Sequence, residues 1–128
     1  MQPTIFSQII AGTIPCHKIY EDAKTLAFLD IKPIQPGHTI IISKLATQFV
    51  WDLPQKDYTA LMETAQKVAQ RLKNVLAVAY IGEKIVGVDV AHAHVHIIPF
   101  SVAADLDATP PEQIDHDSLT ALAKKLAF

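Results

Sequence analysis

The feature that most constrains the fold is a strict alternation of residue type late in the chain. Residues 92–97 read His-Ala-His-Val-His-Ile, and residues 90–98 combine this alternation with β-branched side chains. Such a pattern predicts a strand, whose successive side chains point to opposite faces of a sheet. We therefore expect the three imidazoles on one face, with neighbours about 6.6 Å and the outer two about 13 Å apart. Ala93, Val95 and Ile97 are expected in the core.

Hydrophobic periodicity and turn residues predict the remaining elements. Helices are expected over 5–10, over about 55–73 and from about 117; strands are expected over 17–21, 25–30, 38–43, 75–81 and 86–100. The expected turns are Asp22-Ala23-Lys24 and Gly82-Glu83-Lys84. Strands that follow one another as hairpins, with the helices set apart, predict an α+β fold: an antiparallel sheet of about five strands with the long helix packed on it.

Length and composition limit the classes of protein to be considered. The 128 residues, half of them hydrophobic, suit one domain over 1–128, in which about 101–128 form a tail with the final helix. A net charge of −2 gives no broad positive field, so no nucleic-acid partner is expected. No apolar run approaches the roughly 20 residues of a membrane span, and the first residues do not resemble a signal peptide. The single cysteine, Cys16, fits a reducing compartment, so the predicted location is cytoplasmic.

A metal site is one interpretation of the histidine row. Two imidazoles on a strand can share one zinc ion, but a third on the same straight strand lies too far away. Zinc would therefore need a ligand from elsewhere, and spacing selects none among the available residues, which include Cys16, His17, His38 and His116.

Nucleophilic chemistry is the other interpretation, and the one we favour. A neutral imidazole can attack phosphorus and form a covalent intermediate that water then hydrolyses. Flanking imidazoles can donate hydrogen bonds to phosphoryl oxygens or to the leaving group, and an ordinary pKa near 6.5 suits both roles. A purely structural explanation is weaker, because each buried histidine needs hydrogen-bond partners.

The segment HAHVHII resembles the pattern His-φ-His-φ-His-φ-φ, with φ apolar, of the histidine triad (HIT) family of nucleotide hydrolases and transferases. The similarity extends over roughly the first hundred residues, through TIFSQIIAGTIPCHKIYED, LAFLDIKPIQPGHTIIISK and GVDVAHAHVHIIPF. It is closest to the small hydrolase branch that contains adenosine 5′-monophosphoramidases.

The resemblance implies roles for individual residues. His94 would attack the α-phosphate and become nucleotidylated, and His96 would lie near the leaving group. His92 and His38 would orient the site, and Asp30 would accept hydrogen bonds from the ribose hydroxyls. The apolar slot for the base would consist of Ile5, Phe6, Ile9, Phe28 and Ile31, which without the resemblance would be assigned to the core. No cofactor and no metal are implied.

Three positions depart from the family pattern. Thr4 and Ser7 stand where some bacterial relatives have two zinc-binding cysteines, so no structural zinc is expected. Asp89 replaces a hydroxyl residue that touches phosphate; we expect it to turn away or to pair with Lys84 or a histidine, raising that histidine's pKa. Ile81 aligns with an asparagine or glutamine that steadies phosphate, unless the loop slips by a residue or two.

The sequence thus predicts a nucleotide phosphoramidase or hydrolase that acts at the α-phosphate, with a purine as the expected base, through a covalent His94 intermediate. The alternative is a nucleotide-binding regulatory module with vestigial hydrolysis, which Asp89 and Ile81 favour; a histidine-ligated metal enzyme is a third. The expected partners are an AMP-like nucleotide and a second copy of the chain. Members of the family usually pair through the long helix and a strand, and the two subunits then share one continuous sheet.

Overall fold

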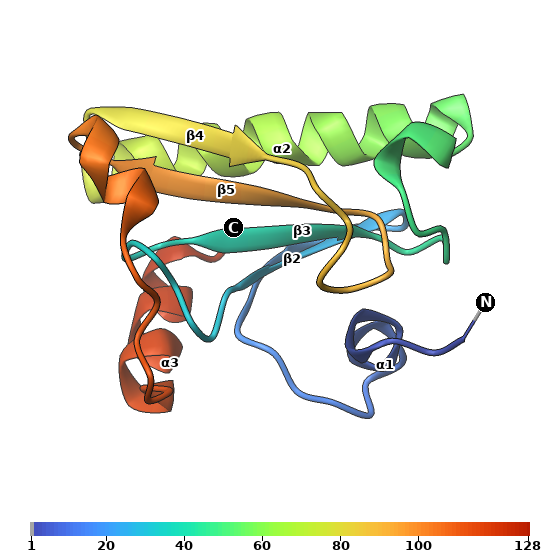
Figure 1. Ribbon diagram of the computed structural model, residues 1–128, viewed down its shortest axis with the longest axis horizontal. Coiled ribbons are helices and arrows are strands. Elements are labelled where there is room, and N and C mark those ends of the chain that lie inside the picture. Colours follow the sequence, from blue (N-terminus) through green and yellow to red (C-terminus); the bar gives the residue numbers. More distant parts are fainter. Residues whose placement is uncertain (1) are drawn as a thin grey trace.

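In the computed structural model, which describes residues 2–128, the chain folds into one five-stranded antiparallel sheet with helices on both faces (Figure 1). The strands, in the spatial order β1-β2-β3-β5-β4, are β1 (Lys18–Glu21), β2 (Thr25–Leu29), β3 (Thr39–Ser43), β5 (His94–Phe100) and β4 (Tyr80–Lys84). The helices are α1 (Ile5–Ala11), α2 (Gln55–Leu76) and α3 (His116–Leu126), with short 3-10 turns at Val50–Asp52 and Ala103–Asp107. The predicted α+β class and antiparallel sheet are confirmed.

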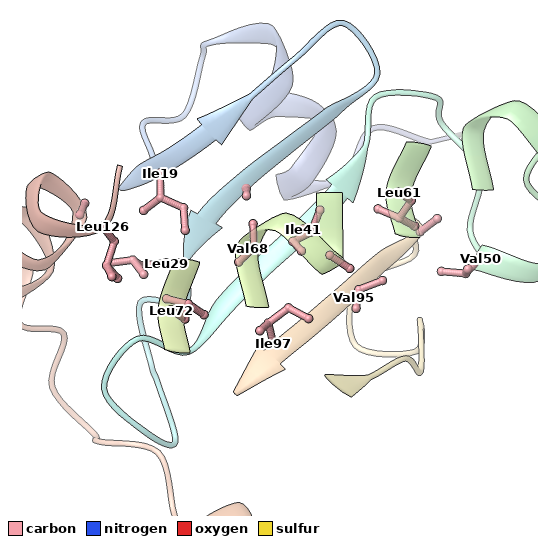
Figure 2. Close-up of a cluster of buried hydrophobic side chains, with 14 of the residues drawn as sticks. Ile19, Leu29, Ile41, Val50, Leu61, Val68, Leu72, Val95, Ile97 and Leu126 are labelled. Atoms are coloured by element: carbon pink, nitrogen blue, oxygen red, sulfur yellow. The ribbon is translucent and has the colours of Figure 1, made fainter. Parts of the chain in front are cut away.

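The two faces of the sheet bury different side chains. On one face, Ile41, Val95 and Ile97 pack against residues of α2 that include Leu61, Val68 and Leu72 (Figure 2). On the other, Leu26, Phe28, Ile40 and Ile42 pack against Phe6 of α1. The central strands β2 and β3 are therefore buried on both faces, which explains their continuous apolar runs. The expected burial of Ala93, Val95 and Ile97 is confirmed.

The predicted boundaries of β4 are wrong. Helix α2 continues to Leu76 and ends at Ala77, whose φ of 54° is the left-handed conformation of a helix cap. Val75 is therefore helical, because it continues the apolar period of α2. Residues 82–84, expected as a turn, lie within β4, where Gly82 pairs with Ile98.

The strand that carries the histidines is shorter than predicted. It starts at His94, not at residue 86 or 90, and residues 85–93 form the connection from β4. Gly87 in this connection has a φ of 82°, which glycine adopts without strain. His92 thus lies just before the ladder begins, so its side chain is positioned by a loop.

The tail packs against the sheet. Helix α3 begins at His116, one residue before the expected start, with the Asp115 carboxylate accepting the Ser118 amide as its N-cap. Its buried face includes Leu119 and Leu126, which join the core on the α2 side. Among residues 2–128, no helix is both long and apolar enough to cross a bilayer.

Candidate active site

A cavity of about 530 Å³ lies on the α1 face of the sheet. It is lined by most of the residues that the resemblance nominated: Ile5, Phe6, Ile9, Phe28, Asp30, Ile31, Asp89, His94 and His96. The nominated residues His38 and His92 do not line it. The structure therefore brings the expected base, ribose and phosphate residues to one cavity and leaves two of the four expected site histidines behind its wall.

Helix α1 forms one wall of this cavity. Thr4 and Ser7 cap its first turn reciprocally: the Ser7 amide donates to Thr4 Oγ1 at 3.2 Å and the Thr4 amide donates to Ser7 Oγ at 2.7 Å. Both hydroxyls are thus engaged in capping the helix. The cap fixes the helix so that the Phe6 ring meets the rings of Phe28 and His94 edge-on, with centroids 5.7 and 4.9 Å apart.

The proton positions of His94 follow from one hydrogen bond. Its Nδ1 lies 2.6 Å from the carbonyl oxygen of His92, and the side chain is 3% exposed. A carbonyl oxygen only accepts, so we assign the ring proton to Nδ1, which donates. The neutral ring then carries its lone pair on Nε2, the nitrogen that a nucleophile needs.

His92 is buried and does not line the cavity. Its Nε2 donates to the Ser43 carbonyl oxygen at 2.6 Å, and the ring is 1% exposed. Its Nδ1 is buried and has no hydrogen-bond partner among residues 2–128. Burial lowers the pKa of His92, so this ring is held in its neutral form. His92 contacts His94 through its backbone carbonyl, which accepts the hydrogen bond from His94 Nδ1.

His38 and His96 form a second linked pair. The Ile34 amide donates to His38 Nδ1 at 3.2 Å, so the proton of neutral His38 is on Nε2. That Nε2 lies 2.9 Å from Nδ1 of His96, to which it donates, and 3.5 Å from Oδ2 of Asp30. Neutral His96 must then carry its own proton on Nε2. The pair therefore makes His96 Nε2 a hydrogen-bond donor, whereas the His92 carbonyl leaves His94 Nε2 an acceptor.

Burial controls the protonation of this pair. It lowers the pKa of both His38 and His96 to about 4, and the positive charge of Lys84 contributes to each shift. Burial also raises the pKa of Asp30, although a hydrogen bond from the Lys32 amide opposes the rise. Both imidazoles are thus neutral at pH 7 in the free protein.

Asp30, His38 and His96 also place three potential metal ligands within 4.8 Å of one another. The hydrogen bond from Ile34 argues against their use, because it occupies the lone pair on His38 Nδ1 and leaves the proton on Nε2. Binding a metal through Nε2 would require moving the ring proton to Nδ1, which breaks that bond, or losing this proton altogether. The geometry therefore favours a hydrogen-bonded pair over a metal centre at this place.

The two departures near phosphate are resolved differently from expectation. Asp89 lines the cavity and, within residues 2–128, forms no ion pair with Lys84 or with a histidine. The expected rise in a neighbouring histidine's pKa is wrong, because burial lowers it instead for His38, His92 and His96. Ile81 packs with the core on the α2 side. Lys84, three residues later, lies opposite His96 in the ladder and is the β4 residue beside the site.

Sequence reasoning missed one end of the cavity. His17 and His116 both line it, and His17 Nε2 lies 3.0 Å from His116 Nδ1. They were considered only as possible metal ligands. Ninety-nine positions separate them, so no local pattern indicates that they meet. The other unpredicted lining residues are Ile14, Pro15, Cys16, Leu29, Ile40 and Val90.

Comparisons with known proteins identify the family of this chain. Residues 11–101 match the family model of the HIT domain. The chain is 34% identical to adenosine 5′-monophosphoramidase HNT1 of Saccharomyces cerevisiae, over 95% of this chain and 79% of that protein. It is 33% identical to the protein hit of Bacillus subtilis, over 96% and 94%. The solved structure of a HIT-like protein involved in cell-cycle regulation from Bartonella henselae superposes with a TM-score of 0.83 at 29% identity, over 96% of this chain and 93% of that one. The chain is a member of the HIT family.

Proposed function

We propose that this protein is a nucleotide phosphoramidase or hydrolase that cleaves at the α-phosphate through a nucleotidyl intermediate on His94. The observation that carries the proposal is the 2.6 Å bond from His94 Nδ1 to the His92 carbonyl oxygen. It leaves the lone pair of Nε2 available on a residue that lines the main cavity. Among the three histidines of the row, only His94 combines these two properties.

The reaction consists of two displacements at phosphorus. In the first, a bond forms between His94 Nε2 and phosphorus while the bond to the leaving group breaks, and the leaving group departs with the electron pair and takes up a proton. In the second, an oxygen–phosphorus bond forms from water while the Nε2–phosphorus bond breaks and its electron pair returns to His94 Nε2; the attacking water gives its proton to solvent, and neutral His94 and the nucleoside monophosphate result. Dividing one difficult displacement into two easier ones is the general benefit of covalent catalysis.

His96 handles the phosphoryl group in this proposal. Its Nε2–H, set by the bond from His38, donates a hydrogen bond to a phosphoryl oxygen as negative charge develops there. Because Nδ1 of His96 already accepts the proton of His38, His96 keeps a single proton on Nε2 and acts as a hydrogen-bond donor, and the leaving group takes its proton from water. The rings of His94 and His96, with centroids 5.0 Å apart, can address the same phosphorus.

The nucleoside occupies the rest of the cavity. Asp30 has its Oδ1 on the Lys32 amide and directs Oδ2 toward His38 at 3.5 Å, which leaves acceptor capacity for ribose hydroxyls. The apolar side chains of Phe6, Phe28 and Ile31 provide flat contact area for a base. Two similar proteins, from Saccharomyces cerevisiae and Schizosaccharomyces pombe, are adenosine 5′-monophosphoramidases, which supports an adenine nucleotide as substrate.

Incubation with labelled adenosine 5′-phosphoramidate tests the mechanism. We expect the wild-type protein to release AMP and a rapid acid quench to trap label on His94. The His94→Ala variant should lose at least about a thousandfold in kcat, while it still binds AMP. Substantial turnover by that variant, or label located on another residue, would contradict the proposal.

A nucleotide-binding regulatory module is the second candidate, because Asp89, which the resemblance sets where a hydroxyl residue touches phosphate, lines the cavity. An ionised carboxylate repels phosphate and so weakens both binding and hydrolysis. The two candidates separate in one assay: AMP binding together with hydrolysis no faster than the uncatalysed rate would favour the module.

We also propose that the protein is a homodimer whose sheet continues through β4. This strand is the outermost of the sheet on that side, and its Tyr80 is exposed. A shallow groove between α2 and β4, lined by residues that include Met62, Ala69 and Ile81, lies beside it. An open edge of this kind pairs readily with another strand. Analytical ultracentrifugation at micromolar concentration should show a dimer, and a monomer would contradict this proposal.

A further inference from the structure

The His17–His116 pair lies in the cavity of His94, yet no step proposed above uses it. His17 comes from the segment that joins α1 to β1, and His116 is the first residue of α3. Their rings are 5.3 Å apart and tilted by 33°, and His17 Nε2 lies 3.0 Å from His116 Nδ1. The pair thus brings the C-terminal helix into contact with the cavity through a polar side chain.

The position of the pair relative to His94 matches the far end of a bound nucleotide. The Leu29 amide of β2 donates to the His17 carbonyl oxygen at 3.0 Å, so His17 lies beside β2 in the lateral position of β1. In the order β5-β3-β2-β1, three strand spacings separate it from the histidine row. Across the strands this is about 14 Å, of the order of the length of a nucleoside monophosphate. Along the strands, His17 lies level with Leu29 and Ile97, one residue from His96 and three from His94. A nucleotide with phosphorus at His94 and its base in the apolar slot points the edge of the base toward this pair.

The pair also offers hydrogen-bonding groups, which the apolar side chains of the slot do not have. The side chains between the triad and the pair are mostly apolar, and they offer a base area but no hydrogen bonds. Burial and the neighbouring His116 lower the pKa of His17, which keeps this ring neutral at pH 7. In a neutral pair, one ring donates to the other, and each ring keeps one further nitrogen.

The hydrogen bond couples the two remaining nitrogens. If His17 Nε2 donates, His17 Nδ1 is an acceptor and His116 Nε2 is a donor. If His116 Nδ1 donates instead, both roles are reversed. In either state the pair offers one donor and one acceptor. The Watson–Crick edge, formed by N1 and the substituent at position 6, also presents one donor and one acceptor, and their order is opposite in a 6-aminopurine and a 6-oxopurine.

We propose that His17 and His116 form a specificity element that recognises the polar edge of a purine base, adenine in one tautomeric state of the pair and a 6-oxopurine in the other. This inference rests on the proposed nucleotide function and extends it to the base. It assigns to the C-terminal helix a part in substrate selection. A pyrimidine, being smaller, does not extend as far toward the pair.

The test measures the dissociation constants of AMP, IMP and purine riboside 5′-monophosphate, which lacks the substituent at position 6. The assay contains a chelator, so that no metal bridges the two imidazoles. Wild-type protein should bind AMP about tenfold more tightly than the unsubstituted nucleotide, as expected for a good hydrogen bond. In His116→Leu the ratio should fall to about one. His116→Gln, whose amide keeps a donor and an acceptor, should restore part of it.

A ratio separates recognition from structure, because a distorted pocket weakens both nucleotides alike. Lys125→Ala, an exposed substitution on the same helix that lies outside the cavity lining, is the matched control and should retain the wild-type ratio. An unchanged ratio in His116→Leu, or an equal loss for both nucleotides, would overturn the inference and leave the proposed function intact. If wild-type protein binds none of the three nucleotides, the proposed function itself is wrong.

Discussion

His38 Nε2 lies 2.9 Å from His96 Nδ1, and this contact determines which nitrogen of the His96 ring carries the proton. The Ile34 amide donates to His38 Nδ1, so the proton of His38 is on Nε2. Since Nε2 of His38 donates to Nδ1 of His96, the proton of His96 is on Nε2, which is directed to the cavity. Buried His38, which directly precedes β3, thereby sets the tautomer of His96, which lines the cavity.

Replacing His38 should therefore impair catalysis without removing a group that touches substrate. In His38→Leu, Nδ1 of His96 loses its donor, and its ring can adopt the tautomer that offers no proton to phosphate. We expect kcat to fall about tenfold, with a smaller change in the dissociation constant of AMP. His38→Gln, which can place an amide donor near the original Nε2, should recover part of the loss. Equal activity of wild type and His38→Leu would show that the pair does not orient His96.

The low pKa values of His38 and His96 predict a dependence of stability on pH. Both pKa values are about 4 in the folded protein, against an ordinary value of 6.5. Between these values the unfolded chain binds more protons, so the free energy of unfolding increases with pH across this window. Their contribution should be complete above about pH 6.5 and decline as the pH falls toward 4. Urea unfolding at a series of pH values measures it. The double variant His38→Leu/His96→Leu should flatten the profile.

Removing the charge of Lys84 should raise the pKa of His38 and of His96, because this charge contributes to lowering both. In Lys84→Met, the titration of the two imidazoles followed by NMR should move to higher pH. Affinity for AMP should also fall, by about threefold at low salt, since an exposed charge is worth at most about 1 kcal/mol. The difference from wild type should shrink at high salt. A loss of affinity that persists in high salt would point to a structural effect instead.

Phe6 links stability to the site. It is 5% exposed and contacts the rings of Phe28 and His94. Phe6→Ala should lower the free energy of unfolding by about 3–5 kcal/mol and weaken AMP binding. Leu72→Ala, in the core on the opposite face of the sheet, is the control: it should cost a similar 2–5 kcal/mol but leave AMP affinity within about twofold. Chemical denaturation and calorimetric titration measure the two quantities.

Much of the fold follows from local patterns in the sequence. The alternation of residues 93–97 identified their core face correctly, and the periodicity of residues 55–73 identified α2 because both patterns reflect burial on one side. The run 75–81 was ambiguous, since a short apolar segment suits a helix end or a strand equally. Gly82 suggested a turn, yet on the edge strand β4 it pairs with Ile98. Whether a short segment extends a helix or begins a strand depends on tertiary packing.

The site was predictable to a different extent. His94 and His96, which belong to one contiguous motif, were predicted to lie together because of their spacing, and both line the cavity. The contact between His17 and His116 depends on how α3 returns to the cavity, which no local pattern determines. The position of Lys84 beside His96 depends on the register of β4, which pairs Lys84 with His96 and Ile81 with Pro99 and cannot be obtained from the sequence of β4 alone.

The contact between the His92 carbonyl and the His94 ring has one more consequence. Every amino acid supplies a main-chain oxygen at its position, so a change of the first imidazole of the row need not disturb the nitrogen that attacks. At position 92 the requirement is therefore on the conformation of the main chain, and another side chain is compatible with the contact as long as that conformation is kept.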